Sequence, residues 1–249
     1  MNLLVTAGGT VAPIDRVRSI SNGFTGRTGA KIALHAYARG HRVTLLTSNP
    51  DALARSPDAI PSDDKWAIRT YRTFDELQIA MAECLTSGGF DGVIHSAAVS
   101  DYRVTGIYSL SDETTFEVGL EENVFFASYC PKLINQSAGK VKSNHSELWL
   151  RLVPAPKLVD QIRSDWKFDG ILVKFKLEVD VDDAQLLDIA ERSRVHSRAD
   201  LMVANTLDGA DTFAFLGPIN WIYERILRSD LPSRLIEAVE RLHRERTHG

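Results

Sequence analysis

The sequence has few cysteines, no long apolar run and no excess of basic residues, and each absence excludes a class of protein. Cys84 and Cys130 are the only cysteines in 249 residues, too few for a disulfide framework, and no CxxC or Cys/His cluster indicates a metal site. No apolar run reaches the roughly 18 residues that a spanning helix needs, and the first residues lack the pattern of a signal peptide. A net charge of −4 argues against a nucleic-acid binder. We therefore expect a cytoplasmic protein that binds neither nucleic acid nor membrane.

The composition that remains is that of a globular chain, with 44% hydrophobic and 25% charged residues. Short apolar runs alternate with amphipathic segments of helical length, a pattern typical of parallel βαβ units. We predict an α/β fold, a Rossmann-like, doubly wound, mostly parallel sheet, in a single domain over residues 1–249. The predicted strands are 2–6, 43–47, 66–71, 90–95, 148–152, 170–175 and 201–204. The predicted helices are 28–39, 74–85, 157–165, 184–194 and 232–243, with a hairpin over 212–224.

Residues 104–144 are the least regular part of the chain. They contain "SLSDETT" and "NQSAGKVKSNHS" around one apolar piece, "VFFASY", which we expect to pack as a strand or a helix. Long connections in compact domains are often functional, so we interpret this segment as a flap over the site. A surface excursion or a dimerisation arm remains the alternative.

The stretch "TAGGTVAPIDRVRSISNGFTGRTG" follows the first predicted strand. Ligands of open α/β sheets bind beyond the carboxyl ends of the strands. Gly8 and Gly9 lie at that end, while Gly26 and Gly29 flank the start of the next helix, whose free N–H groups favour an anion. The four glycines therefore indicate a phosphate-binding crevice. Taken singly, each could instead only permit a tight turn.

A dinucleotide site is the alternative on the same sheet, but its sequence signals are missing. The loop before the helix is too long for G-x-G-x-x-G, and the second strand ends in "LLTSN" without the acidic residue that binds ribose. None of the tyrosines is followed four residues later by a lysine. These features disfavour an NAD(P)-dependent oxidoreductase.

Several motifs resemble, in order, those of the phosphopantothenoylcysteine synthetase (phosphopantothenate–cysteine ligase) family. They are "TAGGTVAPIDRVRSISNGFTGRTGAKIA", "VIHSAAVSDYRV", "VKFKLEVD", "LLDIAERS" and "ADLMVANTL". The resemblance covers nearly the whole chain and is weakest over residues 104–139. It is greater to the stand-alone synthetases than to bifunctional forms fused to a flavin decarboxylase.

The resemblance implies a ligation in coenzyme A biosynthesis. The carboxylate of 4′-phosphopantothenate would attack the α-phosphorus of ATP or CTP, and the amine of L-cysteine would then displace the nucleoside monophosphate. Mg²⁺ would accompany the triphosphate, with few protein ligands, and the chain would form a homodimer. The choice between ATP and CTP stays open.

The resemblance also assigns roles to individual residues. Asn22 matches an asparagine that supports the acyl intermediate, although an Asn beside Gly can equally be a local turn. Lys140 matches the first lysine of a mobile K-x-K-K segment that reaches the triphosphate, with Lys142 as the neighbouring candidate and a solvated lysine as the alternative. His95 ends a strand and is interpreted as structural rather than catalytic.

The remaining matches concern binding. Those assigned to the nucleotide are Gly8, Gly9, Gly26, Gly29, Ala97, Asp101, Pro156 and Phe175. Those assigned to the substrate are Asn22, Lys176 and Asn205. Asp101 could simply cap a turn, Pro156 could start a helix, and Phe175 could belong to the core.

The chain departs from the family pattern at several positions. Phe24 replaces a serine that could donate to phosphate, and Pro154 replaces a lysine. Ser193 and Ser197 occupy two usually basic positions of one helix. The two serines resemble the stand-alone branch as much as a loss of function. Phe24 and Pro154 keep a third hypothesis open, a paralogue that binds nucleotide without catalysis or acts on another substrate.

Overall fold

The computed structural model describes residues 1–54, 61–112, 116–118, 125–127 and 132–248. The chain forms two compact units. The sheet unit contains Met1–Thr10, Asn22–Val99 and Lys157–Gly249, and the insert unit contains Val11–Ser21 and Ser100–Pro156. The expectation of a single domain with a flap over 104–144 stays a prediction.

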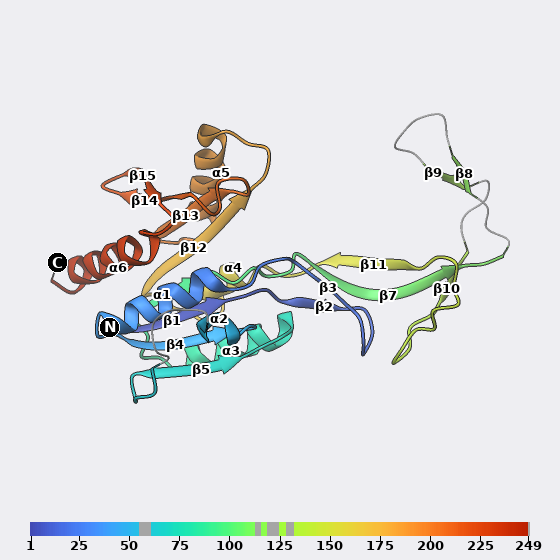
Figure 1. Cartoon of the computed structure of the whole chain (residues 1–249), viewed down its shortest axis with the longest axis horizontal. Helices are drawn as coiled ribbons and strands as arrows, with labels where there is room; N and C mark the ends of the chain where they lie inside the picture. Colours follow the sequence, from blue (N-terminus) through green and yellow to red (C-terminus); the bar gives the residue numbers. More distant parts are fainter. Residues whose placement is uncertain (55–60, 113–115, 119–124, 128–131, 249) are drawn as a thin grey trace. The chain divides into compact units, whose positions relative to one another are not determined.

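The sheet unit is built on an eight-stranded sheet in the order β15-β14-β13-β12-β6-β1-β4-β5 (Figure 1). The strands from β13 to β5 run parallel, while β14 and β15 add an antiparallel hairpin at one side. Their bounds are β1 Asn2–Ala7, β4 Arg42–Thr47, β5 Trp66–Thr70, β6 Gly92–His95, β12 Ile171–Glu178, β13 Leu201–Thr206, β14 Phe213–Ile219 and β15 Ile222–Leu227. The α/β, Rossmann-like fold class is thereby confirmed.

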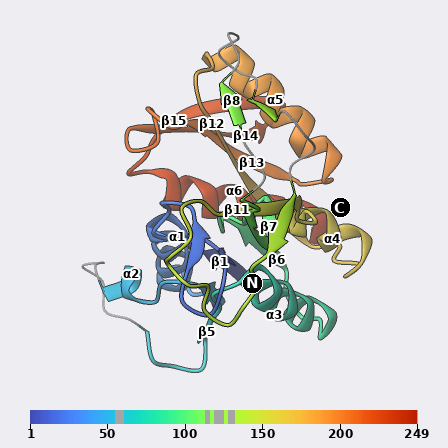
Figure 2. The same ribbon diagram turned by 90° about the vertical axis from the view of Figure 1, so that its right-hand side faces the viewer.

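Helices cover both faces of this sheet, and α1 and α3 lie on opposite sides of β1 (Figure 2). One apolar cluster joins α1 and α6 to β1, β4, β12 and β13, and a second joins α5 to the other face of β13. The helices are α1 Arg27–Ala38, α2 Asp51–Ala54, α3 Phe74–Thr86, α4 Leu158–Ser164, α5 Asp183–His196 and α6 Leu231–His248. Capping boxes at Thr73 and Asp182 begin α3 and α5, which explains why both helices start within one residue of the predicted position.

The insert unit consists of short antiparallel strands. Its members are the hairpin β2 Val11–Pro13 and β3 Ser19–Ser21, the sheet of β10 Leu133–Asn135, β7 Tyr102–Leu110 and β11 Trp149–Pro154, and the pair β8 Phe116–Val118 and β9 Phe125–Ala127. The strand predicted over 148–152 is therefore β11, which pairs with β7 and not with the parallel sheet. Of the piece "VFFASY", Phe125–Ala127 form a strand, and residues 124, 128 and 129 lie outside the described residues.

No helix among the described residues is both long and apolar enough to cross a membrane.

Candidate active site

The candidate site lies at the carboxyl edge of the sheet unit, where the loops that follow β1 and β6 join each other. Ala98 N–H donates to the Gly8 carbonyl oxygen at 2.8 Å, and Thr10 N–H donates to the Ala98 carbonyl oxygen at 3.2 Å. Gly9 and Ala98 form an isolated parallel bridge. These contacts hold the glycine loop against the end of β6, the edge at which open α/β sheets bind ligands.

Gly8 and Gly26 are required by the backbone at this edge. Both have positive φ, 90° at Gly8 and 78° at Gly26. A Cβ atom on Gly26 would lie 2.8 Å from the Gly8 nitrogen, and one on Gly8 would lie 2.1 Å from the Ser48 Oγ. No side chain fits where the start of α1 meets the end of β1, so the backbone itself forms the surface here.

Gly9 and Gly29 are required by close approach alone. A Cβ on Gly9 would lie 2.3 Å from the Asn22 Oδ1, and one on Gly29 would lie 2.5 Å from the Ser96 Oγ. The four glycines that the sequence singles out thus gather around one point, together with Asn22.

Asn22 bridges two loops of this edge. Its Nδ2 donates to the Ala98 carbonyl oxygen at 3.0 Å, and its Oδ1 lies beside Gly9. A carboxamide nitrogen carries two hydrogens, so one N–H is used to hold the loop and the second remains for a ligand. The residue is exposed, as a group that contacts substrate must be.

The first turn of α1 adds backbone donors to the same edge. Gly26 precedes the helix and provides no side-chain cap, and the first turn contains no acidic residue. The first N–H groups of a helix have no intrahelical acceptor. They and the positive end of the helix dipole therefore favour an anion at this position.

Ala97 and His95 belong to a polar chain that begins in β1. The Thr6 Oγ1 lies 2.9 Å from the His95 Nδ1 and accepts from the Ala97 N–H at 3.1 Å. Burial, together with the smaller effect of the charge of Lys174, lowers the pKa of His95 to about 4. His95 is therefore neutral at physiological pH and internally bonded, which agrees with a structural role. The Ala97 N–H is already engaged, so the predicted contact of Ala97 with a nucleotide base would use its carbonyl oxygen.

Phe175, Lys176 and Asn205 lie towards the carboxyl ends of β12 and β13. Phe175 packs against the apolar cluster that contains α1 and α6, so it lies on the α1 face of the sheet, in the strand next to β6. Lys176 forms a 2.8 Å ion pair with Glu178 and would have to leave it to meet a phosphate. Asn205 is 5% exposed, next to Leu177 in the register of the two strands.

Lys174 is a buried cation that the sequence reasoning missed. It is 8% exposed, and its Nζ donates to the Ser193 Oγ at 2.9 Å and to the Ser193 carbonyl oxygen at 3.0 Å. Burial lowers the pKa of its ammonium, while the carboxylate of Asp160 raises it. The resemblance leads one to expect a basic residue at position 193. Here Ser193 is contacted instead by the ammonium of Lys174, which belongs to β12.

Asp101, Lys140 and Pro156 belong to the insert unit. Asp101 accepts the Ala155 N–H at 2.8 Å through its carbonyl oxygen, and Pro156 follows one residue later. Lys140 is exposed, as a mobile phosphate ligand would be.

The backbone on either side of Lys140 is attached to the turn between β2 and β3. Asp15 accepts from the Val141 N–H at 3.1 Å, and the Arg18 guanidinium donates to the Val141 carbonyl oxygen at 2.9 Å. Arg16 N–H donates to the Gly139 carbonyl oxygen at 3.0 Å. The hydrogen bond with Arg18 holds the pKa of the Asp15 carboxyl far below its usual range.

Two further polar residues reach the carboxyl edge without a local sequence signal. Ser48 follows β4 and contacts Gly8, and Arg228 donates from its Nη2 to the Thr28 Oγ1 at 2.6 Å. Arg228 and Thr28 are 200 positions apart, so only the fold reveals the pair. Among the described residues, no group of three or more His, Cys, Asp or Glu side chains could hold a metal ion.

Comparison with known proteins connects this geometry to a family. The family described as "DNA/pantothenate metabolism flavoprotein C-terminal domain" matches residues 1–116. The chain is 31% identical over 205 residues to the Coenzyme A biosynthesis bifunctional protein CoaBC of Thermococcus kodakarensis, with 82% of this chain and 41% of the relative covered. It is 25% identical to the protein of the same name from Methanocaldococcus jannaschii, with 96% of this chain and 50% of that protein covered. The chain thus spans about half the length of these curated relatives or less.

A solved structure is similar along its whole length. The crystal structure of the DNA/pantothenate metabolism flavoprotein from Streptococcus pneumoniae has a TM-score of 0.76 and 29% sequence identity, covering 98% of this chain and 100% of that one.

Proposed function

Because the chain belongs to the family of DNA/pantothenate metabolism flavoprotein C-terminal domains, we propose that it ligates 4′-phosphopantothenate to L-cysteine with ATP or CTP as co-substrate. The product would be phosphopantothenoylcysteine, an intermediate of coenzyme A biosynthesis. The motifs of the phosphopantothenoylcysteine synthetases recur along this chain in the order that the family has.

One observation carries the proposal. The four glycines, the uncapped first turn of α1 and Asn22 converge on one edge of the sheet unit. Backbone that no side chain covers lets phosphates approach closely, and the helix end adds donors and a positive potential. Binding of this kind suits a triphosphate held in line with a carboxylate.

In the first step, a carboxylate oxygen of 4′-phosphopantothenate attacks the α-phosphorus, and the bond from this phosphorus to the pyrophosphate oxygen breaks. Pyrophosphate leaves, and an acyl-nucleotidate remains. Negative charge grows on the phosphate oxygens during the transfer, and the N–H groups of the first turn of α1 are placed to stabilise it. By the family resemblance, Lys140 would add a compact positive charge to the phosphates.

In the second step, the cysteine amine attacks the acyl carbon, and the nucleoside monophosphate leaves. The amine loses one proton to solvent as the amide forms. The second N–H of Asn22, which Ala98 does not use, donates to the acyl oxygen as charge develops there.

The other assignments stay with this proposal. Ala97, Asp101, Pro156 and Phe175 contact the nucleotide, and Lys176 and Asn205 contact the phosphopantothenate. Mg²⁺ would bind mainly to the triphosphate, because the donor set lacks a carboxylate cluster among the described residues. We further expect a homodimer that acts in the cytoplasm.

The oxidoreductase alternative finds no support at this edge. Thr47 ends β4 and is followed by Ser48 and Asn49, so the acidic residue that binds the ribose of NAD is missing. The chain between β1 and α1 contains the β2–β3 hairpin and not a short glycine turn.

Release of pyrophosphate tests the proposal. The chain is incubated with ATP or CTP, with and without phosphopantothenate and cysteine, and pyrophosphate and the amide are both measured. Pyrophosphate should require the nucleotide and phosphopantothenate, and the amide should also require cysteine. Saturable nucleotide binding without any pyrophosphate would identify a non-catalytic paralogue instead.

Two substitutions separate the steps. Asn22→Asp should let pyrophosphate appear while the amide fails to accumulate; because aspartate also loses the hydrogen bond to Ala98, Asn22→Ala serves as the uncharged control. Lys140→Gln should slow the first step about ten- to hundredfold, with Lys142→Gln as its neighbour control. An unchanged rate for Lys140→Gln would remove that lysine from the mechanism.

A further inference from the structure

Arg228 is a charged residue of the carboxyl edge to which neither the motifs nor the resemblance assigns a role. It directly follows β15, and its N–H donates to the Thr212 carbonyl oxygen at 3.0 Å, one residue before β14 begins. Because β14 runs antiparallel to β13, this junction lies at the carboxyl end of β13. Arg228 therefore belongs to the same edge as the glycine loop.

The guanidinium of Arg228 reaches the first turn of α1. Its Nη2 donates to the Oγ1 of Thr28, the second residue of that helix, at 2.6 Å. The contact fixes one end of the guanidinium fork beside the helix N–H groups. Gly29, the next residue, packs against Thr6 and Ser96 at the floor of the candidate site.

The other end of the fork is left incomplete. The Nη1 of Arg228 is buried and has no hydrogen-bond partner, and no ion pair between described residues includes Arg228. Burial lowers the pKa of the guanidinium, and the charge of Asp211 partly offsets this effect. An arginine nevertheless stays protonated in proteins, so a buried donor with positive charge lacks an acceptor, which is costly.

We propose that Arg228 binds a phosphate group of the nucleotide at the first turn of α1, and this inference rests on the function proposed above. A phosphate oxygen would complete the hydrogen bonding of Nη1 and would also accept from the helix N–H groups. Phe24 stands where the resemblance leads one to expect a serine hydroxyl that donates to phosphate. Arg228 supplies a charged donor to that ligand from a distant part of the chain.

Equilibrium binding to the intact chain tests the inference, with ATP, CTP and inorganic tripolyphosphate as probes. Arg228→Met should weaken the binding of all three by about ten- to hundredfold, and Arg228→Lys should retain part of the affinity. Arg225→Met is the matched control, because the Arg225 guanidinium lies 3.9 Å above the Phe213 ring and its loss should change the affinity less than about twofold.

Thermal unfolding of each variant is measured alongside binding. If Arg228→Met unfolds, Thr28→Val provides the test, because this variant keeps the guanidinium and removes the hydroxyl that orients the guanidinium. Several-fold weaker binding of tripolyphosphate to Thr28→Val supports the inference, and unchanged affinity overturns it.

The outcomes distinguish the two proposals. If the unmodified chain binds no nucleotide, the proposed function and this inference both fail. If the unmodified chain binds nucleotide and Arg228→Met binds it equally well, only the inference fails. If Arg228→Met loses nucleotide but keeps its affinity for tripolyphosphate, Arg228 contacts the base or ribose, and the phosphate assignment is overturned.

Discussion

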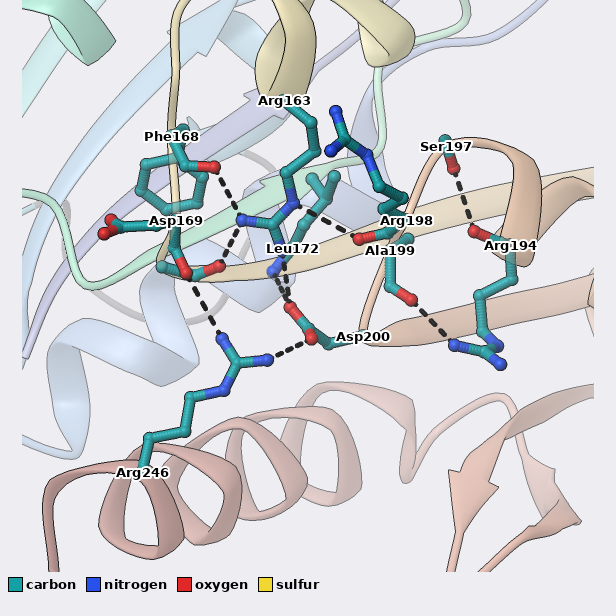
Figure 3. Close-up of polar contacts among 11 residues, drawn as sticks. Arg163, Phe168, Asp169, Leu172, Arg194, Ser197, Arg198, Ala199, Asp200 and Arg246 are labelled. Carbon is teal, nitrogen blue, oxygen red and sulfur yellow. Dashed lines mark hydrogen bonds and ion pairs between the residues drawn. The ribbon is translucent and has the colours of Figure 1, made fainter. Parts of the chain in front are cut away.

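The two edges of the large sheet use arginine in opposite ways. At the amino edge, Arg163 is 11% exposed, and its guanidinium donates to the carbonyl oxygens of Phe168, Gly170 and Arg198 and to the Asp200 carboxylate (Figure 3). Asp200 also accepts from Arg246 and from the Leu172 N–H. At the carboxyl edge, the Arg228 side chain donates to Thr28, and its buried Nη1 has no hydrogen-bond partner within the described parts of the chain.

This difference indicates that the arginine of the amino edge stabilises the fold, whereas the arginine of the carboxyl edge is available for a ligand. All three guanidinium nitrogens of Arg163 donate to the protein, so the residue ties α4 to the starts of β12 and β13. At the carboxyl edge, by contrast, the first turn of α1 has no side-chain cap, and the buried Nη1 of Arg228 has no acceptor among the residues that the structure describes. Unsatisfied donors gathered at one edge are what an anionic ligand requires.

Arg163→Met should have the largest effect on stability. It removes the hydrogen bonds to three backbone carbonyl oxygens and one of the two arginine partners of Asp200, which keeps Arg246 and the Leu172 N–H. The lost hydrogen bonds and the weakened ion pair together should cost about 3–5 kcal/mol. Urea unfolding measures the change in the free energy of unfolding. The exposed Arg192, paired with Asp188, provides the control Arg192→Met, which should cost no more than about 0.5 kcal/mol. Equal effects of the two substitutions would contradict the distinction between a structural arginine and a surface one.

His95 should make stability depend on pH between about 6.5 and 4. Its pKa is about 4 in the folded protein and 6.5 without burial, so the unfolded chain takes up the proton first as the pH falls. The free energy of unfolding therefore decreases on acidification across this range, by about 3 kcal/mol from this group.

His95→Gln should remove that part of the pH dependence. Urea unfolding at pH 7 and pH 4.5 provides the comparison. His41→Gln is the control, because burial lowers the pKa of that histidine too. The part of the pH dependence that comes from His41 is measured with this variant and subtracted. If His95→Gln kept the full slope, His95 would not be the buried neutral group described.

Gly26→Ala should weaken nucleotide binding as well as stability. Gly40 provides the control, because it has a φ of 89° with no atom near its Cβ position, whereas a Cβ on Gly26 would meet Gly8. Gly40→Ala should cost about 1–2 kcal/mol from backbone strain alone, and Gly26→Ala should cost more and raise the nucleotide Kd. If both variants kept the affinity of the unmodified chain, close approach of the backbone would not be part of the site.

Local patterns predicted most of the fold. Apolar periodicity located the helices and strands of the sheet unit, because each buries one face or lies wholly inside. It did not find the short helix α2 or the strands β2, β3, β7 and β10 of the insert unit. It also could not assign the partner of residues 148–152: "LWLRL" has the alternation of a strand, and alternation does not reveal whether the partner runs parallel or antiparallel. The structure pairs this strand with β7.

Only those residues of the candidate site that lie close together in the sequence could be predicted. The glycines and Asn22 lie within one short stretch, so their convergence could be read from their spacing. Lys174 and Arg228 could not be found in this way, because their partners, Ser193 and Thr28, are brought near only by the packing of α5 and α1. The amino-edge cluster around Asp200 joins three separate segments and also lacks a local motif.

Hydrogen–deuterium exchange with and without saturating nucleoside triphosphate tests the central claim most directly. The account predicts slower exchange of amides in residues 22–30, where the first turn of α1 would bind phosphate, and no change around residues 163–172 and 198–201 at the amino edge. Unchanged exchange in residues 22–30 despite bound nucleotide, or protection at the amino edge instead, would contradict it.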